Sequence, residues 1–414
     1  MSASPATPID PPDAAGRAEP ALDWGAAADR VERWLVDREL RGWDPYDALA
    51  SPLVRALAPG RWAKVAWTQL LRRSPVQLRG LLMVPPLPNP KTDALALEAR
   101  LRRSTGADPR AAELVARLEA SVSPEGGWGY PFAWANREAY VPAGTPNAVA
   151  TTFVGHALLD AAERGLVVDE RPLERAGVLL AERLHRVGGG NGTFCFSYTP
   201  LDRRGVHNAS VLAASLLARL GVLGLRPAWR GAAEAAARFT LAAQRPDGSW
   251  PYGIAPRSGW VDSFHTGYVL IALDRIDRTL GGGIAQGALE RGLAYWAETF
   301  LVPPAVAHRP GRPHPVDMHA VAHAILTLLH FRDGRPGALD EARRLARWSL
   351  EEMRGEDGSF HYLRHARWTN RLRYARWVQA WMLRALAELA AVEEEVGATA
   401  AAPSDVLAAD GGVR

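Results

Sequence analysis

The chain has 414 residues, a net charge of +4, and a composition of 48% hydrophobic and 23% charged residues, which is ordinary for a globular protein with a large core. Its basic residues are almost all arginine and form no run of five or more, so we expect no nucleic-acid partner. The single cysteine, Cys195, excludes an intrachain disulfide and a cysteine-based zinc cluster.

The two ends of the chain differ from its middle in composition. Residues 1–22 and 396–414 are rich in Ala, Pro, Gly and Asp, which predicts disordered tails around a single domain at 23–395. Residues 1–20 have neither a basic start nor an apolar stretch, and no run of about 18 apolar residues occurs in the sequence. We therefore expect no signal peptide, no transmembrane segment and a cytoplasmic location.

The first part of the domain predicts amphipathic helices. Apolar residues recur on one face of 28–40, and the segments 61–71 and 93–103 have the same pattern. The proline-rich segment 84–90 lies between the last two and cannot be helical.

From residue 111 onward, two kinds of helix alternate along the chain. The first kind is charged on one side, which predicts outer helices with one wet face, at 111–120, 170–187, 232–244, 286–300 and 339–353. The second kind is apolar all round, which predicts buried inner helices, at 148–162, 209–220, 263–273, 318–329 and 377–389.

A short repeated pattern connects these helices and is clearest in 120–390. Each copy has a glycine-containing turn and an aromatic residue, and the turns lie at 123–130, 192–196, 244–252 and 356–362. A polar residue then leads each inner helix, with spacings of 61, 54, 55 and 59 residues between the successive leaders Asn147, Asn208, Asp262, Asp317 and Arg376. A period of this length favours a ring of helical hairpins, and Asn or Asp at these positions favours helix N-caps.

Inner helices of such a ring run parallel, so their N-terminal ends meet at one end of the ring. The positive ends of the helix dipoles there favour an anionic ligand or a carboxylate. We therefore expect the polar residues that lead the inner helices to converge on one pocket. They are Asn147, His207, Asn208, Asp262, His265, Asp317, His319, Asn370 and Arg376.

Three segments resemble the α/α-toroid superfamily of terpenoid cyclases and protein prenyltransferases. Residues 244–250, Gln-Arg-Pro-Asp-Gly-Ser-Trp, resemble the QW repeat of triterpene cyclases. Residues 262–268, Asp-Ser-Phe-His-Thr-Gly-Tyr, and 317–319, Asp-Met-His, resemble zinc-ligand segments of prenyltransferase β-subunits, with His in place of Cys in the second. The resemblance implies an all-α toroid with six or seven hairpins.

The acid motifs of the terpenoid enzymes are missing from the sequence. No Asp-x-Asp-Asp and no Asp-Asp-x-x-Asp occurs. A second resemblance covers more of the chain: residues 42–47, 89–91, 260–268 and 376–381 are similar to a bacterial group found among polysaccharide-biosynthesis genes. That resemblance implies a carbohydrate context and gives no established reaction.

Asp262 and His265 are the first candidate catalytic pair. They lie three residues apart, on one face of the first helical turn, where a carboxylate orients an imidazole for proton transfer. Asp317 and His319 form the second pair, and with His265 they are a possible zinc site. Capping of the helix ends is the alternative role for both pairs.

The remaining candidates bind substrate in this hypothesis. Arg376 is expected to hold an acidic group, and Trp260 to stack on a ring of the ligand. The other candidate contacts are His207, Asn208, Asn147, Asn370 and Trp377, for which capping or core packing is the alternative.

The function hypothesis is an enzyme acting on a saccharide or glycan, of the lyase, hydrolase or epimerase type, in bacterial polysaccharide biosynthesis. The alternatives are an isoprenoid cyclase or prenyltransferase-like enzyme and a non-catalytic binding scaffold.

Overall fold

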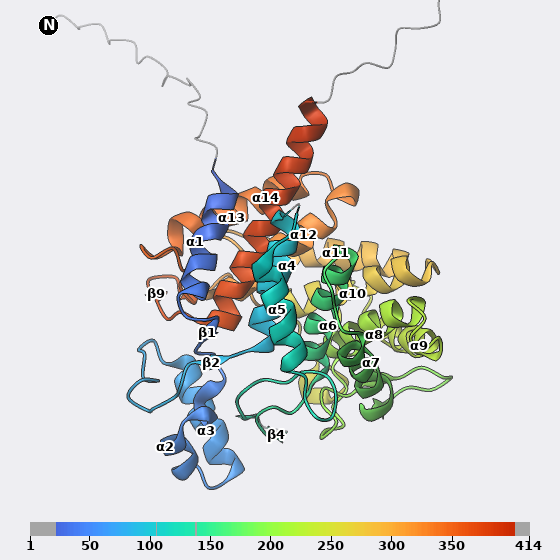
Figure 1. The fold of residues 1–414 in the computed structure, drawn as a ribbon, viewed down its shortest axis with the longest axis horizontal. Helices are drawn as coiled ribbons and strands as arrows, with labels where there is room; N and C mark the ends of the chain where they lie inside the picture. Colours follow the sequence, from blue (N-terminus) through green and yellow to red (C-terminus); the bar gives the residue numbers. More distant parts are fainter. Residues whose placement is uncertain (1–21, 105, 137–138, 402–414) are drawn as a thin grey trace, which may run out of the picture.

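The computed structural model describes residues 22–104, 106–136 and 139–401 (Figure 1). Its core is a ring of parallel inner helices. Each inner helix packs against the next one along the chain, and the last packs against the first, which closes the ring. The inner helices are α4 (Pro90–Arg103), α6 (Ala148–Glu163), α8 (His207–Val222), α10 (Ser263–Leu280), α12 (Met318–His330) and α14 (Ala380–Ala401).

A second layer of helices packs outside the ring, each against an inner neighbour. The outer helices are α5 (Pro109–Ala120), α7 (Glu170–Val178), α9 (Ala228–Ala242), α11 (Gln286–Phe300), α13 (Ala338–Glu352) and α1 (Trp24–Val36). Their amphipathic pattern follows from this position, because one face meets the ring and the other meets water. The architecture is therefore the expected all-α toroid of helical hairpins.

Helix α1 fills the outer position at the point where the ring closes. Gly248 has φ +90° and lies against the backbone of Arg291 in α11, the next outer helix. Gly358 has φ +81° and lies in the same way against Arg30 in α1. The N-terminal helix therefore serves as the outer partner of α14, on which it packs.

The aromatic residues of the turns fasten each turn to the preceding outer helix. Trp128 Nε1 donates to the Leu118 carbonyl at 2.8 Å, and Trp250 Nε1 donates to the Thr240 carbonyl at 2.9 Å. Both indoles are buried and both reach back ten residues. Gln244 donates to the Ala288 carbonyl at 2.8 Å, which fastens the same turn to the following outer helix. These residues of the QW-like segment are structural.

Several element boundaries differ from the sequence-based expectation. Helix α7 ends at Val178 and continues as a π-helical turn, Leu179–Arg183, rather than running to residue 187. Residues 396–401 belong to α14, so the expected tail at 396–414 is wrong for this stretch, and residues 402–414 and 1–21 lie outside the described residues. Asn208 lies inside α8, whose N-cap is Val206, so its predicted capping role is wrong.

Short strands and turns connect the hairpins at the end where the inner helices begin. They are β1 (Arg41–Gly42) with β2 (Leu87–Pro88), β3 (Trp134–Ala135) with β4 (Tyr140–Val141), β5 (Arg186–Val187) with β6 (Cys195–Phe196), and β7 (Val316–Asp317), β8 (Leu363–Arg364) and β9 (Thr369–Asn370) in one sheet. The 3₁₀ turns are η1 (Asp47–Ala50), η3 (Pro256–Ser258) and η4 (Arg332–Gly334), and a π-helical turn, η5 (Ala375–Gln379), leads into α14.

A small lobe between β1 and β2 projects from this end of the ring (Figure 1). It contains α2 (Pro52–Ala56) and α3 (Arg61–Arg73). The buried Arg79 anchors it, donating to Asp47 at 2.7 Å and to the Asp44 carbonyl at 2.8 Å. Within the described part of the chain, no helix is both long enough and apolar enough to cross a membrane.

Candidate functional site in the ring lumen

The inner helices enclose a cavity of about 460 Å³, which we call the lumen. All of the inner helices contribute to its wall, and α4, α10 and α12 do so mostly through their C-terminal halves. A cavity of this volume is in the range that accepts a small organic ligand. The lumen therefore lies toward the opposite end of the ring from the expected meeting point of helix N-termini.

Aromatic side chains form the floor of the lumen. Phe153, Tyr268 and Trp381 line it and contact one another edge to face or at a tilt. Behind them lies the buried Lys91, whose Nζ is 3.8 Å from the ring centroid of Phe153 and 4.9 Å from that of Trp381. Burial lowers the pKa of Lys91 well below its ordinary value. The aromatic floor therefore has the buried amine of Lys91 directly behind it.

Two carboxylates of the wall are bridged by one arginine. Arg384 Nε donates to Glu98 at 3.1 Å, and Arg384 Nη1 is hydrogen-bonded to Glu388. Burial raises the pKa of Glu98. Burial also acts to raise the pKa of Glu388, but Arg384 and Arg102 outweigh it, so this pKa is lowered. Neighbouring carboxyl groups with pKa values shifted in opposite directions are a common acid–base arrangement.

His323 presents an unused ring nitrogen among the residues that line the lumen. The Thr327 hydroxyl donates to the His323 carbonyl at 2.8 Å, so the imidazole Nδ1–H is the donor in the 3.2 Å contact between these side chains. No described residue forms a hydrogen bond with Nε2, which therefore keeps its lone pair. Burial lowers the pKa of His323 to about 3, so the ring is neutral at pH 7.

Arg275 is the cation of the lumen wall that has no partner among the described residues. Arg102, Arg278, Arg332 and Arg384 each form an ion pair with a carboxylate. Arg275 lines the same wall, is half-buried, and forms no ion pair or hydrogen bond with a described residue. Its charge acts to lower the pKa of Glu98, but Arg384 rather than Arg275 forms the hydrogen bond to that carboxyl group. The guanidinium of Arg275 therefore has donors available for an anionic ligand.

The Asp262–His265 pair lies at the start of α10, whereas Arg275 of the lumen wall lies toward the end of the same helix. Asp262 caps α10 by accepting from the His265 backbone N–H at 2.9 Å, and its other oxygen contacts His265 Nδ1 at 2.7 Å. Burial acts to raise the pKa of Asp262, but the His265 imidazole outweighs it, and the pKa is lowered. Asp262 therefore both caps α10 and orients the His265 imidazole.

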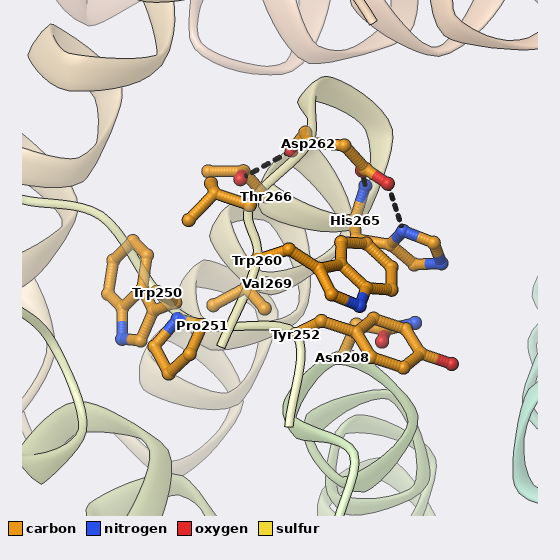
Figure 2. A pocket seen from close by; sticks show the side chains of 10 residues that line it. Asn208, Trp250, Pro251, Tyr252, Trp260, Asp262, His265, Thr266 and Val269 are labelled. Atoms are coloured by element: carbon orange, nitrogen blue, oxygen red, sulfur yellow. Dashed lines mark hydrogen bonds and ion pairs between the residues drawn. The ribbon is translucent and has the colours of Figure 1, made fainter. Parts of the chain in front are cut away.

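The space in front of this pair is small. Figure 2 shows Trp260 stacked on Tyr252. The centroids of these two rings are 4.1 Å apart, and the Arg309 guanidinium lies 4.1 Å from the Trp260 centroid. Two groups at this distance must occupy opposite faces of the indole. The hollow lined by Trp260 and His265 measures about 10 Å³, which is room for a water molecule but not for a sugar.

Asp317 and His319 are held by protein partners. Asp317 caps α12 by accepting from the His319 N–H at 2.9 Å, and it accepts from Trp377 Nε1 at 3.2 Å. His319 Nδ1 donates to the Trp377 carbonyl at 3.2 Å, so Nε2 accepts from the Tyr268 hydroxyl at 2.9 Å. Burial raises the pKa of Asp317 to about 6 and lowers that of His319 well below its ordinary value.

The structure does not form the possible zinc site from His265, Asp317 and His319. Both ring nitrogens of His319 are bonded to protein groups. Among the described residues, no group of three or more His, Cys, Asp or Glu side chains is placed to hold a metal ion.

The other residues predicted to bind substrate are buried and lie in different hairpins. Asn147 caps α6 by accepting from Ala150 N–H at 2.9 Å. His207 stacks on an outer-helix phenyl ring, and burial lowers its pKa to about 4. The amide oxygen of Asn208 has no hydrogen bond. Asn370 accepts from Leu372 N–H at 3.1 Å.

Arg376 is buried in an ion pair with Asp44 from the N-terminal segment. This pair ties the start of α14 to the segment that leads into the lobe.

The structure thus brings Asp262, His265, Asp317, His319 and Trp377 into one cluster, through ring contacts of Phe264 with His265, His319 and Trp377. It leaves Asn147 and His207 outside that cluster.

Sequence reasoning missed the residues of the lumen wall. Their signal was present, because charged residues such as Glu98, Asp160, Arg275 and Glu388 interrupt helices that are otherwise buried. Each one alone looks like a solvated residue near a helix end. Only closure of the ring shows that they face a common space.

Comparisons with solved structures identify the fold. The chain has the α/α-toroid fold of an unsaturated glucuronyl hydrolase specific for heparin (TM-score 0.53, 13% identity, 75% of this chain and 89% of that one). It is similar to a sugar epimerase from a ruminal bacterium (0.56, 11%, 75% and 90%) and to ent-copalyl diphosphate synthase from Streptomyces platensis (0.50, 17%, 90% and 69%). The chain matches no protein-family model and no curated protein sequence.

Proposed function

We propose that the protein is an enzyme that acts on an acidic saccharide bound in the lumen. The observation that carries the proposal is Arg275, a half-buried guanidinium without a partner among the described residues, on the wall of a cavity of about 460 Å³. A uronate carboxylate is a suitable partner for it, because Arg binds carboxylates through two parallel hydrogen bonds.

The composition of the wall favours a saccharide over an isoprenoid. Charged and hydrogen-bonding side chains from every inner helix surround a floor of aromatic rings. Hydroxyl groups of a sugar would find donors and acceptors in this wall, and a sugar ring would meet the aromatic floor. An isoprenoid chain would instead leave Arg275 and Nε2 of His323 without partners.

The reaction would depend on proton transfer by groups of the wall. Glu98, with its raised pKa, is the proposed acid, and Glu388, with its lowered pKa, is the proposed ionised partner. Nε2 of His323, whose ring is neutral, is a proposed hydrogen-bond acceptor for a sugar hydroxyl. Hydrolase, lyase and epimerase reactions all need such an acid and base. We also propose that the enzyme acts in polysaccharide biosynthesis.

The proposed binding test uses two disaccharides that differ in one group. Cellobiouronic acid carries a carboxylate where cellobiose has a hydroxymethyl group. By titration calorimetry, we expect Arg275→Ala to weaken binding of the acid about 10- to 100-fold, since a charge-assisted hydrogen bond contributes ~1.5–3 kcal/mol. The affinity for cellobiose should not change.

Arg278→Ala is the matched control, because Arg278 is on the same helix but is exposed and paired with Asp274. Equal losses for Arg275→Ala and Arg278→Ala, or no preference of the native protein for the acid, would contradict the proposal.

A second experiment decides which end of the ring does the chemistry. With any saccharide found to turn over, Glu98→Gln should lower kcat while Asp262→Asn and His265→Ala leave it largely intact. The reverse result would place proton transfer at the Asp262–His265 pair, as the sequence-based hypothesis has it. Melting curves of each variant separate loss of activity from loss of the fold.

A further inference from the structure

The lobe between β1 and β2 has a surface unlike the rest of the molecule. Within residues 52–86, every side chain that is mainly exposed is apolar, a glycine or proline, or an arginine. The large exposed apolar residues are Leu53, Leu57, Trp62, Leu70, Val76, Leu81 and Met83. The exposed arginines are Arg55, Arg61 and Arg73. We call these ten residues the lobe patch.

The charge of this segment is of one sign. No Asp or Glu occurs between Asp47 and Asp93, whereas the segment contains five arginines and two lysines. Arg55 and Arg73 form no ion pair with any carboxylate of the described residues. The patch therefore offers uncompensated positive charge beside exposed Leu, Met and Trp side chains.

These apolar side chains are not needed to hold the lobe together. Its small cores consist of other residues, among them Leu49, Val54, Leu71 and Val84, all of which are buried. Trp62 is 62% exposed and Leu81 is 79% exposed. Exposed apolar groups clustered in one small lobe are characteristic of a surface that meets another apolar phase or partner.

We infer that the lobe patch docks on the surface of an anionic lipid bilayer. Apolar side chains that enter the headgroup region, together with basic residues that attract anionic lipid, are the two requirements for binding at a membrane surface. A second copy of the chain fits less well, because pairing the patch with itself brings arginines against arginines with no acid between them.

The position of the lobe is compatible with an accessible lumen. The lobe projects from the end where the inner helices begin (Figure 1). The lumen-lining residues of α4, α10 and α12 lie mostly in the C-terminal halves of these helices. Docking through the lobe would leave the mouth of the lumen uncovered, near Arg278 and Arg332. The inference does not depend on which ligand the lumen accepts.

The test is co-sedimentation of the full chain with vesicles. We expect binding to phosphatidylcholine vesicles that contain phosphatidylglycerol, weaker binding at high salt, and little binding to phosphatidylcholine alone. The double variant Trp62→Ser/Leu81→Ser should lose binding, and Arg55→Gln or Arg73→Gln should each weaken it about fivefold. Val167→Ser is the control, since Val167 is 94% exposed and lies outside the lobe.

Several results would overturn the inference. One is absence of binding to either vesicle; another is binding that neither salt nor the arginine variants weaken. A third is a dimer in light scattering that dissociates in the Trp62→Ser/Leu81→Ser variant, which would assign the patch to a second copy. The arginine variants keep the test valid if the double variant melts at a lower temperature than the native chain.

Discussion

Replacing Arg384 by Met tests the charge network of the lumen wall. The guanidinium is buried between Glu98 and Glu388, and Met fills a similar volume without charge. Removing one partner of a buried ion pair costs ~3–5 kcal/mol when the other charge is left alone. Glu388 keeps Arg102 at 2.7 Å, so Glu98 is the carboxyl group left without an ion pair.

The loss of stability should therefore depend on pH through Glu98. Burial already raises the pKa of Glu98, so the stability that its protonated form provides is complete below the unfolded pKa and is lost as pH rises through the folded pKa. Without Arg384 the folded pKa rises further. The variant should lose up to about 1.4 kcal/mol more per pH unit than the native protein, over the interval between the two folded pKa values.

Urea unfolding at about pH 5 and about pH 8 measures this difference. We expect a loss of ~3 kcal/mol or more at the higher pH and a clearly smaller loss at the lower pH. Arg278→Met, which removes an exposed cation near the mouth, should change stability by less than about 1 kcal/mol at both. An equal loss at both pH values for Arg384→Met would refute the view that Glu98 takes up a proton.

Three further predictions concern the turns and the cap of α10. Trp250→Phe removes the hydrogen bond to the Thr240 carbonyl and should lower the free energy of unfolding by ~1–3 kcal/mol in urea melts, because the carbonyl stays buried. Gly248→Ala should lower the melting temperature more than Gly224→Ala. Both glycines have positive φ, but only a Cβ at residue 248 would clash with backbone, 2.5 Å from the Arg291 carbonyl oxygen. Equal effects of the two substitutions would refute this prediction. Asp262→Asn should destabilise at neutral pH, with a deficit that shrinks as pH falls through the lowered folded pKa, and an unchanged deficit in acid would contradict it.

The fold was predictable because its signals are local and repeated. Apolar and amphipathic segments alternate, and Asn147, Asp262 and Asp317 cap their helices as their positions indicate. The exact ends of the helices were less predictable than their existence. The π-helical turn at Leu179–Arg183 has no distinct sequence signal, and tertiary packing decides where α8 starts relative to Asn208.

The site was less predictable than the fold because it depends on ring closure. Spacing along one helix correctly paired Asp262 with His265, three residues apart. It gave no information on whether space exists in front of that pair, which Tyr252, Trp260 and Arg309 fill. Arg275 lies in the last turns of α10, where a cation also interacts favourably with the helix dipole. The sequence therefore could not show that Arg275 forms no ion pair, and only the structure does.

The most direct test of the account is to fill the lumen and measure binding. Leu326 lines the lumen and is only partly buried, so Leu326→Trp adds bulk to the space where the saccharide is placed. Leu223→Trp is the control at an exposed position outside the lumen. Titration calorimetry with cellobiouronic acid should show binding to the native protein and the control and none to Leu326→Trp. Unchanged binding to a folded Leu326→Trp variant would show that the ligand site lies elsewhere.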